Sequence, residues 1–254
     1  QVGLAAFAPE DLTRSDVNND DRPYASLVFL ANSRVNLQDD GQTAIQSTLT
    51  VGVLGTRIAE NLQKQIHALT ESEPPKGWQH QISQGGEPTL RYTYAHQRLW
   101  LVRDGEHHLE VKYSNEGSVG FLTEANSAIS ARWGRINTPW WSFAPDRAEY
   151  FSQPTTGLLN KNVTGSSEFY VWAGAKVRAR AYNAFLQGQF RDSELTYSWN
   201  ELRPVLGEAW LGATKQISPH SRLSWVWRYQ SSELPSGNGD RNLLWGSILI
   251  NRDF

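Results

Sequence analysis

Several ingredients are missing from this chain of 254 residues, and each absence excludes a class of protein. It has no cysteine, which removes disulfide frameworks, thiol nucleophiles and cysteine-type zinc sites. No apolar run approaches the roughly 20 residues that a membrane-spanning helix needs, and the mean hydropathy is −0.53. The net charge is only −2, so the electrostatic footprint of a nucleic-acid-binding protein is absent and we expect no nucleic-acid partner.

Aromatic residues, by contrast, are plentiful in this polar chain. It contains eleven Trp, nine Tyr and nine Phe. A sequence that is polar on average and rich in aromatics is typical of outer-membrane β-barrels, because half of each strand faces a wet lumen and aromatic side chains form girdles at the two interfaces.

Residues 168–181 carry a strand-like alternation. Successive side chains of a strand point to opposite faces, so an apolar face against a largely polar one indicates a wall between hydrocarbon and water. One such segment alone would fit a half-buried strand of a soluble sandwich equally well. The apolar set is Phe169, Val171, Ala173, Ala175, Val177, Ala179 and Ala181, and the opposite set is Glu168, Tyr170, Trp172, Gly174, Lys176, Arg178 and Arg180.

The alternation recurs in other segments, including 45–53, 205–216 and 223–230. The recurrence favours an all-β, transmembrane antiparallel β-barrel that forms one domain over residues 1–254, and a soluble β-sandwich remains the alternative. In the segment 29–38 we assign Phe29, Ala31, Ser33, Val35 and Leu37 to the outer face, and Asn32, Arg34, Asn36 and Gln38 to the lumen.

Eleven segments are strand candidates, whereas closed bacterial barrels use an even number of strands, so one has been split or missed. Charged side chains on the lumen faces are expected to form a hydrogen-bonded plug, with a pore lining as the alternative. The strand candidates are 1–8, 24–38, 42–54, 89–102, 107–121, 124–134, 168–181, 182–190, 204–217, 221–232 and 243–254. The lumen charges are Arg34, Arg132, Lys176, Arg178, Arg180, Arg228, Glu168 and Glu208.

The two ends of the chain also carry information. The last strand closes on Phe254, with Ile248 and Ile250 on the same face, which resembles the carboxy-terminal signal of outer-membrane barrels. At the other end, Val2 to Phe7 already has strand character with no signal peptide before it. We therefore expect the signal peptide to be missing before Gln1.

Three stretches are too long for turns, namely 9–23, 55–88 and 135–167, and long loops are where function on a barrel tends to lie. The second contains one helical pattern, because Ile58, Leu62, Ile66 and Leu69 recur at helical spacing before Pro74-Pro75. We expect this apolar stripe to pack against the protein and so to hold the polar face of the helix in place.

Gln63 and His67 lie four residues apart on that helix and project together. A histidine oriented by a neighbouring amide is a plausible general base, although an ordinary polar contact is the commoner role of such a residue. The other histidines show no metal-ligand spacing, and no Gly-x-Ser-x-Gly, P-loop or dinucleotide motif occurs. Asp20 to Tyr24 is interpreted as a structural corner with an internal Asp–Arg pair.

Four blocks of residues together resemble the LpxR-type lipid A 3'-O-deacylase family. They are Ala8-Pro9-Glu10-Asp11, Asn19-Asp20-Asp21-Arg22-Pro23-Tyr24-Ala25, Gly55-Thr56 leading into Gln63-Lys64-Gln65-Ile66-His67, and Pro75-Lys76-Gly77-Trp78 with Gln81. Their order and spacing match the family over residues 8–85, and the later strands are compatible with it.

The resemblance implies a monomeric barrel of about twelve strands, of which this chain holds ten or eleven, in the outer membrane of a Gram-negative bacterium. It implies hydrolysis of an acyl ester of lipid A, with lipopolysaccharide and the bilayer as partners and a divalent cation, expected to be calcium, as cofactor. His67 matches the family's catalytic histidine and Gln63 the glutamine before it, while Glu73 and Arg14 match substrate-binding positions.

One part of the family pattern is not found in this sequence. The family's first hairpin, with an Asn-Asp pair, should precede Gln1. Either the beginning of the chain is missing from this sequence, or the molecule is a natural variant without part of the active site. The ligands of the metal therefore stay undetermined. A catalytically inactive barrel that serves as a structural protein or a small pore is the alternative function.

Overall fold

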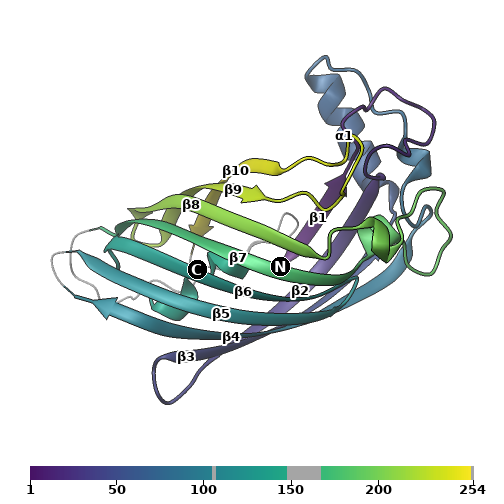
Figure 1. Ribbon diagram of the computed structural model, residues 1–254. Helices are drawn as coiled ribbons and strands as arrows, with labels where there is room; N and C mark the ends of the chain where they lie inside the picture. The colour runs from purple at the N-terminus through teal and green to yellow at the C-terminus, as the bar shows by residue number, and fades with distance from the viewer. Residues whose placement is uncertain (105–106, 148–166, 253–254) are drawn as a thin grey trace.

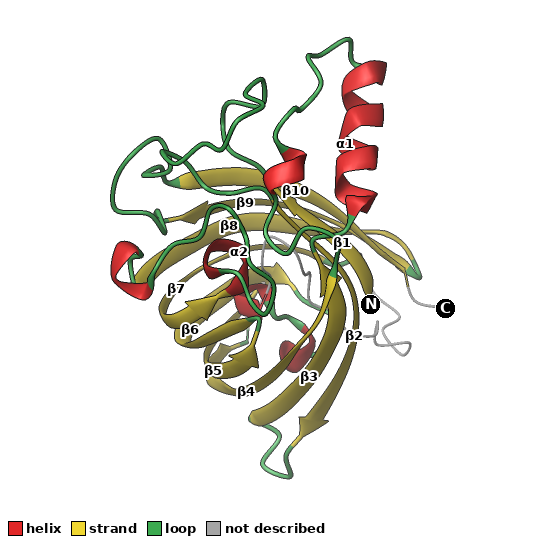
Figure 2. Cartoon of the chain, turned by 90° about the vertical axis from the view of Figure 1, so that its right-hand side faces the viewer, coloured by secondary structure: helices red, strands yellow, loops and turns green. Residues whose placement is uncertain are grey.

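The computed structural model of the chain describes residues 1–104, 107–147 and 167–252. Its strands form one antiparallel sheet in chain order, curled around a central lumen (Figures 1 and 2). Within the described residues, no helix has the length and apolar character needed to cross a membrane. The strands are β1 (Val2–Phe7), β2 (Ala25–Leu37), β3 (Thr43–Leu54), β4 (Glu87–Arg103), β5 (His108–Gly120), β6 (Leu122–Arg135), β7 (Phe169–Asn183), β8 (Val205–Ser218), β9 (Ser221–Gln230) and β10 (Leu243–Arg252).

Short helices occupy the connections between strands. In the part of the chain that the structure describes, β1 pairs only with β2 and β10 only with β9, so these two strands are the edges of the sheet. The helices are α1 (Arg57–Leu69) and α2 (Ala184–Gln187), and the single 3-10 turns are η1 (Trp78–His80), η2 (Trp140–Ser142), η3 (Pro145–Arg147) and η4 (Trp199–Glu201).

The side chains of the sheet are arranged with apolar residues outside and charges inside. On β7 the side chain of Val177 is 60% exposed, whereas its neighbours Lys176 and Arg178 are 3% and 2% exposed. Trp225 and Trp227 of β9 also face outward. The predicted alternation is therefore confirmed on these strands, and the outer wall is the apolar surface that a lipid environment requires.

On β2 the predicted faces are reversed. Phe29 points to the lumen side and is 2% exposed, in a cluster that also contains Leu27 and Phe185. Because alternation then fixes every later position, Arg34 lies on the outer face, where it donates a hydrogen bond to Asn36 over 3.2 Å. The prediction failed because the lumen is apolar at the end where α2 enters it. On this strand the large apolar side chains therefore point into the lumen and polar side chains such as Arg34 point outward.

The predicted strand 182–190 does not exist. β7 runs through to Asn183, whose side chain caps α2 by accepting the backbone N–H of Phe185 over 3.0 Å, and Gly188 ends the helix with φ +71°. The described chain therefore has ten strands. The connection at Ser218–Ser221 was predicted correctly, whereas Phe254 lies outside the described residues.

The lumen contains a network of buried ion pairs. Glu208 contacts Lys176 over 3.0 Å and both Arg178 and Arg228 over 2.8 Å. The η2–η3 segment also enters the network, because Asp146 pairs with Lys112 over 3.1 Å. This cross-linked interior agrees with the predicted plug. The other predicted lumen charges Arg132, Arg180 and Glu168 are likewise buried.

Candidate active site at the rim

A glycine sets the start of α1 at the rim of the barrel. Gly55 follows β3 with φ +70°, and a Cβ atom at this position would lie 1.9 Å from the carbonyl oxygen of Ser83. Only glycine permits so close an approach in the left-handed region. The backbone N–H of Gly55 also donates to the carbonyl of Ser26 over 2.9 Å, so α1 departs from the wall in a defined direction.

Helix α1 contacts the protein through its polar face. Ala59 is 1% exposed and packs with Tyr24 and Trp78. The expectation that the apolar stripe packs against the protein was therefore wrong. The side chains of the stripe are exposed, namely Ile58 (54%), Leu62 (46%), Ile66 (49%) and Leu69 (84%). The small Ala59 allows close approach, and hydrogen bonds rather than apolar burial fix the rest of this face.

Gln63 is held by a buried tryptophan. The indole Nε1 of Trp78 donates to Oε1 of Gln63 over 2.7 Å, and Trp78 is 1% exposed. Its ring packs on Tyr24 with centroids 4.8 Å apart. The residue before Trp78 is Gly77, and a Cβ atom at that position would lie 2.6 Å from the Tyr24 ring, so the close packing requires glycine. Since an indole only donates, Oε1 is the acceptor and the amide N–H groups of Gln63 are left available.

His67 is oriented by a backbone carbonyl. Its Nδ1 lies 2.6 Å from the carbonyl oxygen of Glu73. A carbonyl only accepts, so Nδ1 carries the proton and the neutral ring keeps a lone pair on Nε2. The carboxylate of Glu73 is exposed, so the structure connects this residue to His67 through its main chain. Helix α1 ends at Leu69 and Glu71 adopts φ +55°, which turns the chain back toward His67.

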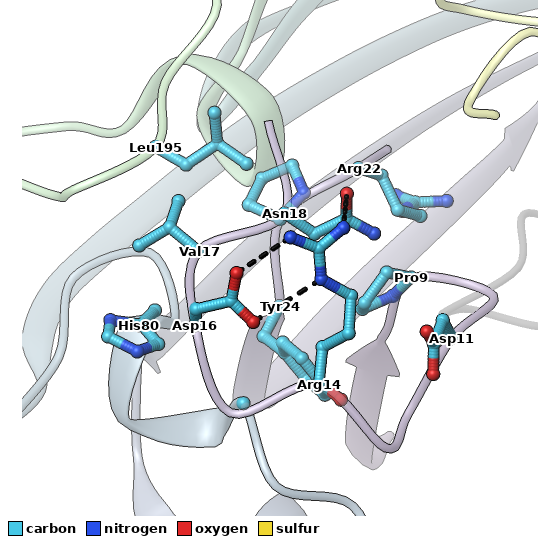
Figure 3. Close-up of a pocket in the computed structure, with 12 residues that line it drawn as sticks. Pro9, Asp11, Arg14, Asp16, Val17, Asn18, Arg22, Tyr24, His80 and Leu195 are labelled. Atoms are coloured by element: carbon cyan, nitrogen blue, oxygen red, sulfur yellow. Dashed lines mark hydrogen bonds and ion pairs between the residues drawn. The ribbon is translucent and has the colours of Figure 1, made fainter. Parts of the chain in front are cut away.

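Arg14 lies in a separate pocket that is open to solvent and holds about 310 Å³ of empty space (Figure 3). Its guanidinium donates hydrogen bonds to both carboxylate oxygens of Asp16 over 2.7 and 3.3 Å. This contact lowers the pKa of Asp16 and raises the pKa of Arg14. Neither Gln63 nor His67 lines the cavity. The two sites share Gly77 and Tyr24 as a common wall, because both residues line the cavity and both adjoin Trp78.

Two polar contacts at this rim were not predicted. Asp21 pairs with Arg241 over 2.9 Å, whereas the expected internal partner, Arg22, stacks on the Phe7 ring at 4.6 Å. His80 contacts a carboxylate oxygen of Glu194 over 2.8 Å. Both contacts join loops that are more than 100 residues apart, and no local pattern in the sequence could indicate them.

The expected calcium ion finds no ligand set among the described residues. No three histidine or acidic side chains converge in residues 1–104, 107–147 and 167–252. Calcium takes six to eight oxygen ligands. Two oxygens at this site already have partners, because Oε1 of Gln63 accepts from Trp78 and the Glu73 carbonyl oxygen contacts Nδ1 of His67. These residues therefore do not fit a calcium site.

Comparison with known proteins gives one family and one fold. The family model described as "Outer membrane protein LpxR" matches residues 1–254. Among solved structures, LpxR from Salmonella typhimurium superposes with a TM-score of 0.80 at 17% sequence identity, covering 99% of this chain and 82% of that one. A search of curated proteins found no match.

Proposed function

This chain belongs to the LpxR family of outer membrane proteins, and from that premise we propose that it hydrolyses an acyl ester of lipid A in the outer membrane. The observation that carries the proposal is the paired orientation of Gln63 and His67 on α1. Each side chain has one polar atom tied to the protein, and the atom that chemistry would use is left available.

In the proposed reaction His67 is the general base. Its Nδ1–H is bonded to the carbonyl of Glu73, so Nε2 accepts a proton from a water molecule. The water oxygen attacks the ester carbonyl carbon and a tetrahedral intermediate forms. The bond to the alcohol oxygen then breaks, and His67 returns the proton to that oxygen. The products are a free fatty acid and a hydroxyl group on the lipid.

Gln63 supplies a hydrogen-bond donor for the same intermediate. Because Trp78 occupies Oε1, the amide N–H of Gln63 is the group presented to a ligand. A fixed donor aimed at a developing oxyanion is worth more than a mobile one, because no reorganisation is needed during the reaction. In this proposal Gln63 and His67 act on opposite ends of the reacting unit, the carbonyl oxygen and the attacking water.

Arg14 is proposed to bind an anionic group of the lipid. Guanidinium groups bind phosphate and carboxylate through paired hydrogen bonds. In the structure Asp16 occupies this fork, so an incoming phosphate group would replace the carboxylate. The cavity containing Arg14 lies beside Trp78 across Tyr24 and Gly77, which would place a lipid headgroup next to the reacting ester.

Purified protein in detergent tests the proposal directly. Wild-type protein is incubated with lipid A, and the products are measured by mass spectrometry for loss of one acyl chain. We expect deacylation with wild-type protein and none with His67→Ala. Deacylation at the wild-type rate by His67→Ala would remove this residue from the mechanism. A matched control is Lys64→Ala, which changes an exposed residue of the same helix.

A non-catalytic barrel is the second candidate, and the lumen bears on it. A conducting pore needs a continuous wet path, whereas Glu208 and Asp146 cross-link several strands and the η2–η3 segment through buried ion pairs. The interior therefore supports a structural role over a pore if catalysis fails. Planar bilayers distinguish the two, because a pore gives discrete conductance steps.

A further inference from the structure

The exposed apolar stripe of α1 has no partner in the part of the chain that the structure describes. Ile58, Leu62 and Ile66 are each about half exposed, and Leu69 is 84% exposed. On a helix these positions share one side, because residues three and four apart are neighbours. Large apolar groups gathered on one helix face mark a surface that is covered in the native environment.

Another side of α1 is charged. Lys64 and Glu60 form an ion pair over 2.7 Å, in which the Lys64 side chain is 48% exposed and the Glu60 side chain 18% exposed. The site residues Gln63 and His67 lie between this side and the apolar stripe. A helix with one apolar side, one charged side and little overall hydrophobicity is the pattern of a segment that lies in a membrane interface.

The placement of α1 fits such a role. Figure 2 looks along the barrel, and α1 extends outward beyond the ring of strands in the plane of the view, while Figure 1 shows it at the end of the barrel. The helix axis therefore runs across the barrel axis. When the barrel spans a membrane, a helix in this direction lies roughly parallel to the bilayer surface. Its 13 residues span about 20 Å.

The apolar outer wall continues to the base of α1. Leu30, Val51 and Leu90 lie side by side on β2, β3 and β4, and they are 57%, 46% and 56% exposed. Val53, also on the outer face, is four residues before the first residue of α1. The stripe is thus contiguous along the chain with the surface that lipid covers, which favours lipid over a protein partner.

We propose that α1 is an interfacial anchor whose apolar stripe inserts into the acyl chains of the outer leaflet. This inference rests on the family's location in the outer membrane and goes beyond the proposed hydrolysis. Insertion of the stripe sets the depth of the site in the membrane. With Ile66 in the hydrocarbon, the neighbouring His67 lies at the boundary between acyl chains and headgroups, the depth at which a lipid ester is found.

The absence of cysteine makes a direct test simple, because a single introduced thiol reports one position. Ile66→Cys places a fluorescent nitrobenzoxadiazole label on the stripe, and Lys64→Cys places it on the charged side as the matched control. The proteins are reconstituted in phosphatidylcholine–phosphatidylglycerol vesicles containing lipids with a nitroxide on the acyl chain. We expect strong nitroxide quenching and a blue-shifted emission at position 66, with iodide quenching several-fold weaker than at position 64.

Two outcomes would overturn the proposal. Equal iodide quenching at both positions without nitroxide quenching would mean that water covers the stripe. Shielding at position 66 that grows with the protein-to-lipid ratio would mean that a second copy of the chain covers it. Circular dichroism and nitroxide quenching of a label at the outward position Leu223→Cys report whether each variant is folded and inserted.

A second measurement separates this inference from the proposed hydrolysis. The double variant Leu62→Ser/Ile66→Ser is assayed on vesicle-embedded lipid A and on lipid A dispersed in detergent. Removing two large apolar side chains weakens insertion of the helix into hydrocarbon, so we expect the rate on vesicles to fall about tenfold or more while the detergent rate is unchanged. A double variant that hydrolyses vesicle-embedded lipid A at the wild-type rate would contradict an anchoring role. The fluorescence result holds even where no hydrolysis is detected.

Discussion

The indole N–H of Trp78 points at Oε1 of Gln63 over 2.7 Å, and this single contact decides which end of the Gln63 amide faces a ligand. Trp78 is buried between α1 and Tyr24, so the contact is part of the framework of the rim rather than a surface interaction. The chemistry proposed for the site depends on this orientation and on the corresponding contact between His67 and Glu73.

The role of Trp78 is tested by removing its N–H group while keeping an aromatic ring. Trp78→Phe retains packing on Tyr24 but leaves Oε1 of Gln63 without its donor. Because the amide then turns freely, we expect kcat to fall about tenfold with KM little changed. In the Gln63→Ala background the same substitution should have no further effect on kcat. A further loss of about tenfold in kcat in the Gln63→Ala background would mean that Trp78 acts independently of Gln63.

The donor role of Gln63 gives a second prediction. Gln63→Glu preserves the shape and can still accept from Trp78, but it replaces the amide N–H with a carboxylate oxygen. We expect kcat on lipid A to fall on the order of a hundredfold, as for loss of an oxyanion donor. Steady-state kinetics with Gln65→Glu, an exposed position on the same helix, provides the control. Unchanged kcat in Gln63→Glu would exclude the amide as a donor.

The buried network in the lumen predicts a large stability effect. Glu208 neutralises Lys176, Arg178 and Arg228, so Glu208→Gln leaves buried positive charges uncompensated. Breaking a buried ion pair from one side typically costs about 3–5 kcal/mol of unfolding free energy. Urea unfolding in detergent should show this loss, whereas Asp39→Asn in an exposed hairpin should change it by less than about 0.5 kcal/mol. Equal stability of the two variants would refute the proposed charge compensation.

The Arg14–Asp16 pair predicts a pH dependence. The hydrogen bond from Arg14 lowers the pKa of Asp16 below its unfolded value. A lowered carboxyl pKa contributes stability above the unfolded pKa, and this contribution disappears as pH falls through the folded pKa. Wild-type protein should therefore have a slightly higher Tm than Asp16→Asn at pH 7, and the difference should vanish only in strong acid. A Tm difference that grows as the pH falls below the unfolded pKa of Asp16 would have the wrong sign.

Much of the barrel could be predicted because alternation is a local property. On β7 and β9 the alternation in the sequence predicts which side chains face outward, and the structure confirms the prediction. The prediction for β2 failed because Phe29 belongs to an apolar cluster inside the lumen, and its partner Phe185 is more than 150 residues away. No window around Phe29 contains that information.

The site shows the same division between local and distant information. The helix bearing Gln63 and His67 followed from spacing, and its residues 57–69 lie where the pattern indicated. The side to which the apolar stripe points could not be predicted, because the helix is held by Trp78 and the main chain of Glu73 rather than by its large apolar side chains. The pairing of Asp21 with Arg241 could not be predicted either, because the two residues are far apart in the sequence.

The source of the oxygen in the released fatty acid is the most direct test of the central claim that water activated by His67 hydrolyses the ester. Wild-type protein is incubated with lipid A in water enriched in oxygen-18, and the fatty acid and the lipid are analysed by mass spectrometry. The account predicts one oxygen-18 atom in the released acid, none in the new lipid hydroxyl, and no release by His67→Ala. Unlabelled acid, or labelled acid released equally by His67→Ala, would contradict it.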